Sequence, residues 1–281
     1  MAQIFSTMRI LLAFLILACA VPAVAEEIPK PLWEIGLAGG IFTIPQYVGS
    51  DQRYTLPLGL PYLIYRGEIL RADRDGVRGR LFEADGLSLD LSFSFGLPVR
   101  NSNDARRGMP ALHLVGQVGP KLNWIIEHHD ADKLSLHLPL RIAADTSQTF
   151  LGWVAEPSLR YERYDILPRM EKLILRLDGG LMYASRRYNQ YYYGVDPIYA
   201  TTTRPAYRAR QGLHSYFLDT SLSYQYDDEL NVGLMVSMRT LSGGVNAGSP
   251  LVRNRFYLSA GLGFTWRLWA SEAMVPPADS H

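Results

Sequence analysis

The chain has 281 residues, a formal net charge of +1 and one cysteine, Cys19. This balanced charge gives no indication of nucleic-acid binding, and a lone cysteine excludes a disulfide framework. Beyond the N-terminal segment, no run approaches the roughly 18–20 apolar residues that a transmembrane helix needs. The 17 tyrosines and five tryptophans favour β structure instead.

The first 25 residues have the layout of a secretory signal peptide. Arg9 is their only charge, an apolar run follows from Ile10 to Ala20, and the segment ends on Ala-Val-Ala at 23–25. This pattern predicts cleavage before Glu26. The alternative is a lipoprotein signal, because Ile-Leu-Ala-Cys at 16–19 would then leave Cys19 acylated as the first mature residue.

Strict alternation of apolar and polar residues is the main structural signal of the mature chain. It runs through 87–99, 134–143 and 256–268, where every second residue is apolar. A period of two gives a strand one apolar and one polar face. Several of these runs exceed the roughly 9–11 residues that a tilted strand needs to cross a bilayer, whereas strands of soluble sandwiches average five or six. A soluble sandwich is the weaker alternative.

The fold class expected is therefore all-β: a closed antiparallel transmembrane β-barrel over residues 26–270. A bilayer leaves no partner for unpaired backbone groups, so such strands must close on one another. We expect about twelve strands; ten is the alternative count, because the third and fourth are short and rich in charge. The ranges are 32–45, 56–65, 68–73, 77–84, 87–99, 111–127, 133–144, 149–165, 172–186, 213–227, 230–242 and 255–269.

The lengths of the connections predict how the barrel is oriented. If the N-terminus is periplasmic, every periplasmic connection is short, and the long ones at 46–55, 100–110, 187–212 and 243–254 fall outside. Short periplasmic turns and long outer loops are typical of outer-membrane barrels. Both termini are then periplasmic, and residues 271–281 form a periplasmic tail.

The polar strand faces place charges of both signs inside the barrel. Such a set either lines a selective pore or forms internal ion pairs that fill the interior, and the cost of a buried unpaired charge favours the second. The candidate lumen charges are Glu34, Asp90, Lys121, Arg141, Glu156, Arg160, Arg176, Asp178, Asp219, Arg239 and Arg267.

The sequence gives no specific support for catalysis. His214 adjoins Ser215 near the outer rim, but neighbours on a strand point to opposite faces, so we expect no dyad between them. The chain has no G-x-S-x-G elbow, no H-E-x-x-H and no cysteine pair. We therefore predict no catalytic site, no metal site and no cofactor.

The longest outer loop is rich in tyrosine. Tyrosine supplies rigid contact area and hydrogen bonds, so a recognition surface is one interpretation. The other is that the tyrosines fold the loop over the mouth of the barrel as a lid. The residues concerned are Tyr188, Tyr191, Tyr192, Tyr193, Gly194 and Val195.

Short segments spread over the mature chain resemble a known family. They are WEIGL at 33–37, PQYVGS at 45–50, PYLIY at 61–65, YYGV at 192–195 and SPLV at 249–252. In order and spacing, the chain resembles the MipA/OmpV group of outer-membrane proteins (MltA-interacting protein). One departure is the end: barrels of this kind often finish on an aromatic residue, whereas here Trp269 is followed by further residues up to His281.

The resemblance implies a non-enzymatic scaffold of the outer membrane, surrounded by outer-membrane lipids. In this family, the scaffold links a murein-degrading lytic transglycosylase to a bifunctional murein synthase, so these two enzymes are the implied partners in peptidoglycan turnover. A small pore or solute-binding barrel is the alternative. A lipid-modifying enzyme is a more distant one.

Overall fold

The computed structural model of the chain describes residues 30–66, 70–73, 76–84, 86–129, 131–167 and 172–275. The expected signal peptide with Cys19, and the end of the expected tail, lie outside the described residues. Thirteen strands of the described chain form one antiparallel sheet, and two short strands pair separately near the ends.

The strands of the large sheet follow one another along the chain as antiparallel neighbours. They are β2 (Trp33–Pro45), β3 (Arg53–Arg66), β4 (Leu70–Asp73), β5 (Gly76–Ala84), β6 (Leu87–Gly96), β7 (Val115–His129), β8 (Asp132–Asp145), β9 (Phe150–Ala155), β10 (Ser158–Arg163), β11 (Leu173–Ala184), β12 (Gly212–Gln225), β13 (Leu230–Thr240) and β14 (Phe256–Ala270). β14 pairs with β2, so the last long strand lies beside the first.

Each predicted range overlaps a strand of this sheet, and the range 149–165 contains two. β9 and β10 are separated at Glu156-Pro157. Proline has no backbone N–H and interrupts the ladder of hydrogen bonds there. The amide of Glu156 donates to Pro139 O at 3.2 Å, and the amide of Leu181 donates to Pro157 O at 3.1 Å. The wall therefore stays joined across the break.

Several predicted boundaries are wrong; β3 begins at Arg53 rather than at 56, and the largest difference flanks one connection. The strands expected at 87–99 and 111–127 are observed at 87–96 and 115–129, so the connection between them runs over 97–114. Within it, Val99 and Leu112 form only an isolated bridge. Pro98 and Pro110 cannot donate to a ladder, which is why regular pairing ends before the alternation does.

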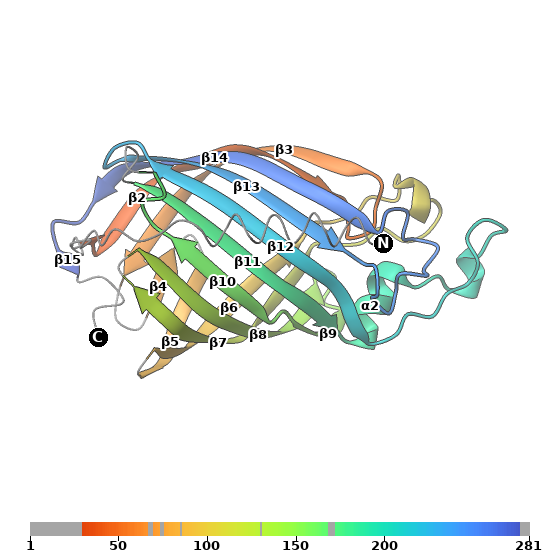
Figure 1. Cartoon of the computed structure of the whole chain (residues 1–281). Helices are drawn as coiled ribbons and strands as arrows, with labels where there is room; N and C mark the ends of the chain where they lie inside the picture. The colour runs from red at the N-terminus through yellow and green to blue at the C-terminus, as the bar shows by residue number, and fades with distance from the viewer. Residues whose placement is uncertain are drawn as a thin grey trace.

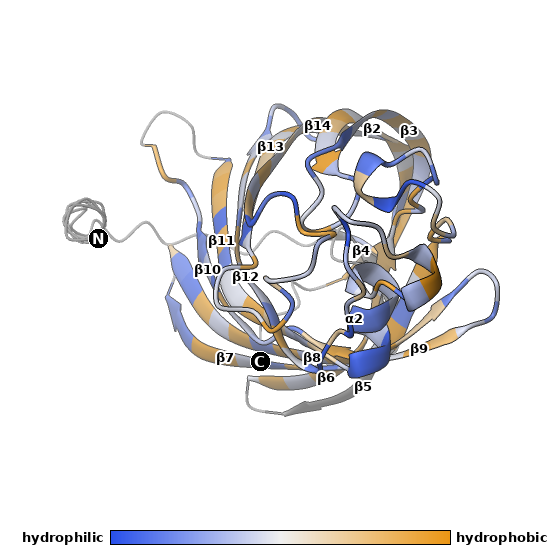
Figure 2. Ribbon diagram, turned by 90° about the vertical axis from the view of Figure 1, so that its right-hand side faces the viewer, coloured by the Kyte–Doolittle hydropathy of each residue, from blue (hydrophilic) through white to orange (hydrophobic). Residues whose placement is uncertain are grey.

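The sheet curls into a barrel (Figure 1). At the two ends of the strand order, β10 pairs with β11 and also with β8, and β9 pairs with β8 and also with β11. Figure 2 looks along the barrel and shows the strands arranged around its interior.

The two faces of the strands differ as the alternation predicts. On β14, the outward side chains Phe256, Leu262 and Trp266 are 55%, 62% and 46% exposed, whereas the inward Tyr257 is 6% exposed. Hydrophobic and hydrophilic residues alternate along the ribbons (Figure 2). A belt of exposed apolar side chains around a barrel is what a lipid environment requires. No helix of the described residues is long and apolar enough to cross a membrane.

The long and short connections lie at opposite ends of the barrel. α2 (Arg186–Tyr193) belongs to the end with long connections, and β15 (Met274–Val275), which pairs with β1 (Lys30–Pro31), lies at the other end (Figure 1). The turn at 226–229 shows how a short connection is fixed. Asp227 Oδ1 accepts hydrogen bonds from the amides of Glu229 (2.8 Å) and Leu230 (2.7 Å), an Asx-type turn.

Gly152 is a position where only glycine fits. Its φ is +99°, and an added Cβ would overlap Ser185 Oγ. We therefore expect Gly152→Ala to lower the free energy of unfolding by about 2 kcal/mol or more, from backbone strain and overlap together. Urea unfolding in detergent micelles, followed by tryptophan fluorescence, measures it. Gly59→Ala is the matched control, because nothing lies within 4 Å of its added Cβ; equal losses for both variants would contradict the prediction.

Candidate functional site

Four long connections form a folded cap over one end of the barrel. We use "the cap" for residues 46–52, 97–114, 185–211 and 241–255, which include the 3-10 turns η1 (Asp104–Arg106) and η2 (Pro197–Tyr199). The cap has a small core of its own, formed by Ala105, Met109, Val195 and Leu251. Loops that share a core cannot move independently, so the cap is a structured part of the molecule.

Helix α2 occupies the start of the expected loop 187–212, where no helix is predicted, and its first residue, Arg186, is predicted as the end of a strand. It begins after Ser185, whose Oγ accepts from the amide of Tyr188 at 3.4 Å and from the amide of Trp153 at 3.1 Å. Serine is a favoured residue at a helix N-cap, which is the signal that could have revealed it. Because the same hydroxyl contacts β9, the helix is attached to the barrel wall where it starts.

The tyrosines of α2 point into the mouth of the barrel rather than away from it. Tyr188, Tyr192 and Tyr193 are buried, with Tyr193 fully so, and Val195 is 1% exposed. The Tyr188 and Tyr192 rings lie 5.0 Å apart, and Tyr191 packs edge-on against Tyr192 at 5.2 Å. This geometry favours the interpretation of α2 and its tyrosines as a lid over the barrel, and we call this segment the lid. A recognition role for the loop residues, including Gly194, stays a prediction.

Hydrogen bonds attach these tyrosines to other parts of the barrel. The Tyr193 hydroxyl donates to Val48 O at 2.8 Å and is 2.9 Å from His214 Nε2. The Tyr188 hydroxyl accepts from Gln117 Nε2 at 3.3 Å. The residues joined are 145 positions apart in one case and 71 in another. The lid is therefore tied to β7, to β12 and to the first loop of the cap.

Two buried arginines join the loops of the cap through backbone carbonyls. Arg106 donates to Tyr192 O at 3.0 Å, and Arg204 donates to Ala105 O at 3.1 Å and to Arg107 O at 2.9 Å. Burial lowers the pKa of the Arg106 guanidinium from its usual value. Hydrogen bonds from a charged donor are stronger than neutral ones, so these contacts hold the loops together.

Beneath the lid, Glu156 bridges two arginines. Its carboxylate forms ion pairs with Arg141 and, at 3.3 Å, with Arg239, and Arg239 lies 3.9 Å from Asp219 Oδ2. The Arg239 guanidinium also lies over the Phe217 ring, 4.9 Å from its centroid. Two positive and two negative charges thus meet in one group, which we call the Glu156 cluster (Arg141, Glu156, Asp219 and Arg239).

The remaining candidate lumen charges lie farther from α2 and also have opposite charges beside them. Asp90 on β6 is the register partner of Lys121 on β7 and accepts from Asn123 Nδ2 at 2.6 Å. Arg163 and Asp132, which are not among the candidate lumen charges, also form an ion pair at 3.0 Å. Three more ion pairs on the described strands involve candidate lumen charges: Arg160 with Asp178 at 2.7 Å, Arg176 with Glu162 at 2.6 Å, and Arg267 with Glu34 at 4.0 Å.

The expectation that His214 and Ser215 point apart is wrong. His214 Nδ1 lies 2.9 Å from Ser215 Oγ, and both side chains are buried. The cause is a register shift between Met182 and Tyr183 of β11, which leaves His214 without a register partner there. Such a bulge breaks the alternation locally and re-aims a side chain. His214 Nε2 is already engaged by the Tyr193 hydroxyl, so the histidine holds the lid.

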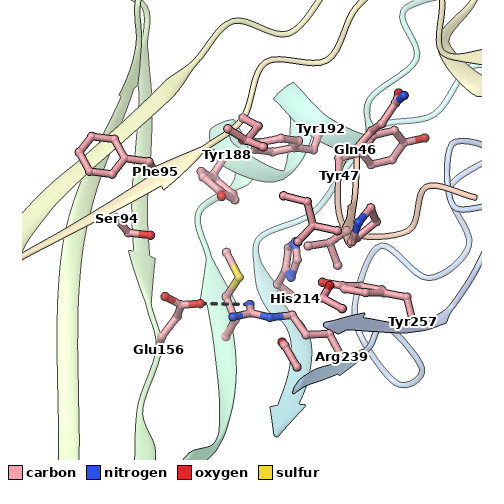
Figure 3. A pocket seen from close by; sticks show the side chains of 18 of the residues that line it. Gln46, Tyr47, Ser94, Phe95, Glu156, Tyr188, Tyr192, His214, Arg239 and Tyr257 are labelled. Atoms are coloured by element: carbon pink, nitrogen blue, oxygen red, sulfur yellow. Dashed lines mark hydrogen bonds and ion pairs between the residues drawn. The ribbon is translucent and has the colours of Figure 1, made fainter. Parts of the chain in front are cut away.

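A cavity of ≈ 310 Å³ lies between the lid and the Glu156 cluster. Figure 3 shows Tyr188, Tyr192, Tyr47, His214, Tyr257, Arg239 and Glu156 around it, whereas the ring of Phe95 points away. The cavity is lined by residues of the cap, including α2, and of seven strands of the wall. Among the described residues, no group of three or more His, Cys, Asp or Glu is arranged to hold a metal ion.

The tyrosines of the cap give a pH-dependent readout of its packing. Burial raises the pKa of both Tyr47 and Tyr191 to about 12, from an ordinary value of about 10. A raised folded-state pKa contributes stability below pH ~10 that is lost as the pH rises through about 12. We expect these two tyrosines to ionise late in a tyrosinate absorbance titration. If Tyr47→Phe and Tyr191→Phe remove signal near pH 10 instead, the prediction is contradicted.

A family model matches most of the chain. The family model described as "MltA-interacting protein MipA" matches residues 36–268. No curated protein matches the chain significantly in sequence. Among solved structures, an outer membrane channel from Pseudomonas putida F1 is similar at 10% identity and a TM-score of 0.46, covering 89% of this chain and 100% of that one. The NanC porin is similar at 9% identity and a TM-score of 0.36, covering 83% and 100%. Likenesses at this level do not define a function.

Proposed function

Because the chain belongs to the MipA family, we propose that it is a non-enzymatic interaction protein that binds a lytic transglycosylase of the MltA type. The chain is an outer-membrane β-barrel, and the family's description as MltA-interacting carries the choice of partner. A bifunctional murein synthase is the second partner proposed. The protein would then hold murein-degrading and murein-building enzymes together at the membrane.

The proposed topology closes the barrel and places both termini in the periplasm. The pairings of β10 with β8 and of β9 with β11 support closure. The cap then faces the outside, and the short connections face the murein layer. This leaves the short-turn end, with 226–229 and the β1–β15 pair, as the surface that a periplasmic enzyme can reach.

The filled mouth is the observation that favours a scaffold over an open pore. Tyr193 is fully buried within the cap, and the Glu156 cluster lies across the interior beneath it. Ion pairs that satisfy one another offer little to a passing ion, and conduction requires a path wide enough for one. The similarity to solved channel structures therefore does not decide between a scaffold and a pore.

The direct test is binding of a purified MltA-type lytic transglycosylase to the full-length protein in detergent micelles. We expect saturable binding in surface plasmon resonance with the barrel immobilised through its cap. A barrel immobilised through the short-turn end is the matched control and should bind less, because the proposed contact surface is then blocked. Absence of binding in both orientations would sink the proposal.

The pore alternative has its own measurement. In planar bilayers, we expect the purified native protein to give no stable current steps. Reproducible single-channel conductance of the native protein would favour the pore over the scaffold.

A further inference from the structure

The cavity beneath the lid has features of a ligand site that the proposed scaffold function does not use. Its volume of ≈ 310 Å³ lies at the lower end of the range of about 300–1,000 Å³ for small-molecule pockets. It is lined by apolar, aromatic and polar side chains from strands and cap alike. A ligand here would be small and would contact both the wall and the lid.

The charged groups of the lining are already compensated. Glu156 is shared between Arg141 and Arg239, and Arg239 also faces Asp219. The four charges of the Glu156 cluster sum to zero. An ionic ligand would therefore lose its hydration without finding a free counter-charge, and this disfavours charged ligands.

The groups left to bind a ligand are neutral hydroxyls. Ser94, Tyr257 and Ser259 line the cavity, and within the described part of the chain their hydroxyls make no hydrogen bond with another residue. They come from two sides of the barrel, since Ser94 is on β6 and the other two are on β14. Each can donate or accept, so they match a ligand that carries several hydroxyls of its own.

The lid adds aromatic surface to the same cavity. Tyr188 and Tyr192 of α2 lie over it, with Tyr47 of the cap beside them (Figure 3). Aromatic rings offer an apolar face and a polar edge. A ring-shaped polyol has this double character, because its C–H groups form an apolar face and its hydroxyls project from the edge.

We propose that this cavity binds a small, neutral, hydroxyl-rich ligand of the monosaccharide class. The apolar face of the sugar ring packs against the tyrosines of the lid, and its hydroxyls meet Ser94, Tyr257 and Ser259. The Glu156 cluster closes the cavity on the side away from the lid. This site is independent of the partner enzyme, which is proposed to bind at the opposite end of the barrel.

Isothermal titration calorimetry on the full-length protein tests the ligand class. The detergent must have no sugar headgroup, so dimethylamine-oxide micelles replace maltosides. The probes are glucose, N-acetylglucosamine and myo-inositol as neutral ligands, glucuronate as the anion and glucosamine as the cation. We expect saturable binding of at least one neutral probe and weaker binding of both charged ones. No saturable binding of any neutral probe, or tighter binding of a charged one, would overturn the proposal.

Three variants then locate the site. Ser259→Phe fills the cavity and should reduce the affinity at least tenfold, whereas Ser221→Phe, inward on β12 but outside the lining, should change it less than twofold. Tyr257→Phe keeps the ring and removes one hydroxyl, for an expected loss of about two- to tenfold, the value of one hydrogen bond. If Ser259→Phe and Tyr257→Phe both bind the ligand like the native protein, the ligand does not occupy this cavity, and the proposal fails even if the lytic transglycosylase still binds.

Discussion

Replacing Glu156 with alanine is expected to lower the free energy of unfolding by about 3–5 kcal/mol, the cost of leaving buried charges without their partner. Glu156 is the only carboxylate that Arg141 contacts among the ion pairs of the described chain, and it also pairs with Arg239. Arg141 is 6% exposed, so water cannot replace the lost carboxylate. Urea unfolding in detergent micelles measures the loss.

The controls separate the lost charge from the lost side chain. Glu156→Gln keeps the shape and one acceptor oxygen, so it should recover a part of the loss. Adding Arg141→Met to Glu156→Met removes both members of one pair and leaves Arg239 near Asp219; this double variant should be more stable than Glu156→Ala. Asp104→Ala breaks the exposed pair with Arg107 and should cost less than about 1 kcal/mol. If Glu156→Ala costs no more than Asp104→Ala, the cluster does not stabilise the barrel.

The barrel was predictable because its signal is local and repeated. Alternation along β14 assigns Phe256, Leu262 and Trp266 to one face and Tyr257 to the other without any knowledge of the neighbouring strands. The candidate lumen charges follow from the same alternation, and pairs such as Arg160 with Asp178 lie on adjacent strands. The register between neighbouring strands decides which charges form ion pairs, and this register cannot be derived from the sequence alone.

The parts that were not predictable depend on contacts between distant segments. His214 and Ser215 share a hydrogen bond only because β11 and β12 shift register beside them. The cavity needs the first cap loop, α2 and β14 together, and these lie far apart in the sequence. The division of β9 from β10 could have been expected, since Pro157 marks it. Whether the tyrosine-rich loop is buried or exposed could not be predicted, because a tyrosine side chain suits both environments equally well.

The second large effect concerns the lid. Replacing Tyr193 with alanine removes a fully buried ring from the cap, together with hydrogen bonds to Val48 O and His214. Truncating a buried aromatic residue typically costs about 3–5 kcal/mol. Because α2 is attached through a few side chains, we expect this loss to appear as local opening of the cap rather than as unfolding of the barrel. Trypsin cleavage at Arg187 and Arg208 should accelerate on the order of a hundredfold.

Two controls connect the cleavage to the lid. Tyr193→Phe keeps the ring and should accelerate cleavage only about tenfold, the value of its hydrogen bonds. Ile198→Ala alters a side chain that is 83% exposed on the same loop, and should leave the rate unchanged. Single-channel recording then asks whether the lid closes the barrel: if it does, Tyr193→Ala conducts where the native protein does not. Should the variant be cleaved no faster than the native chain, the tyrosines of α2 do not hold the cap in place.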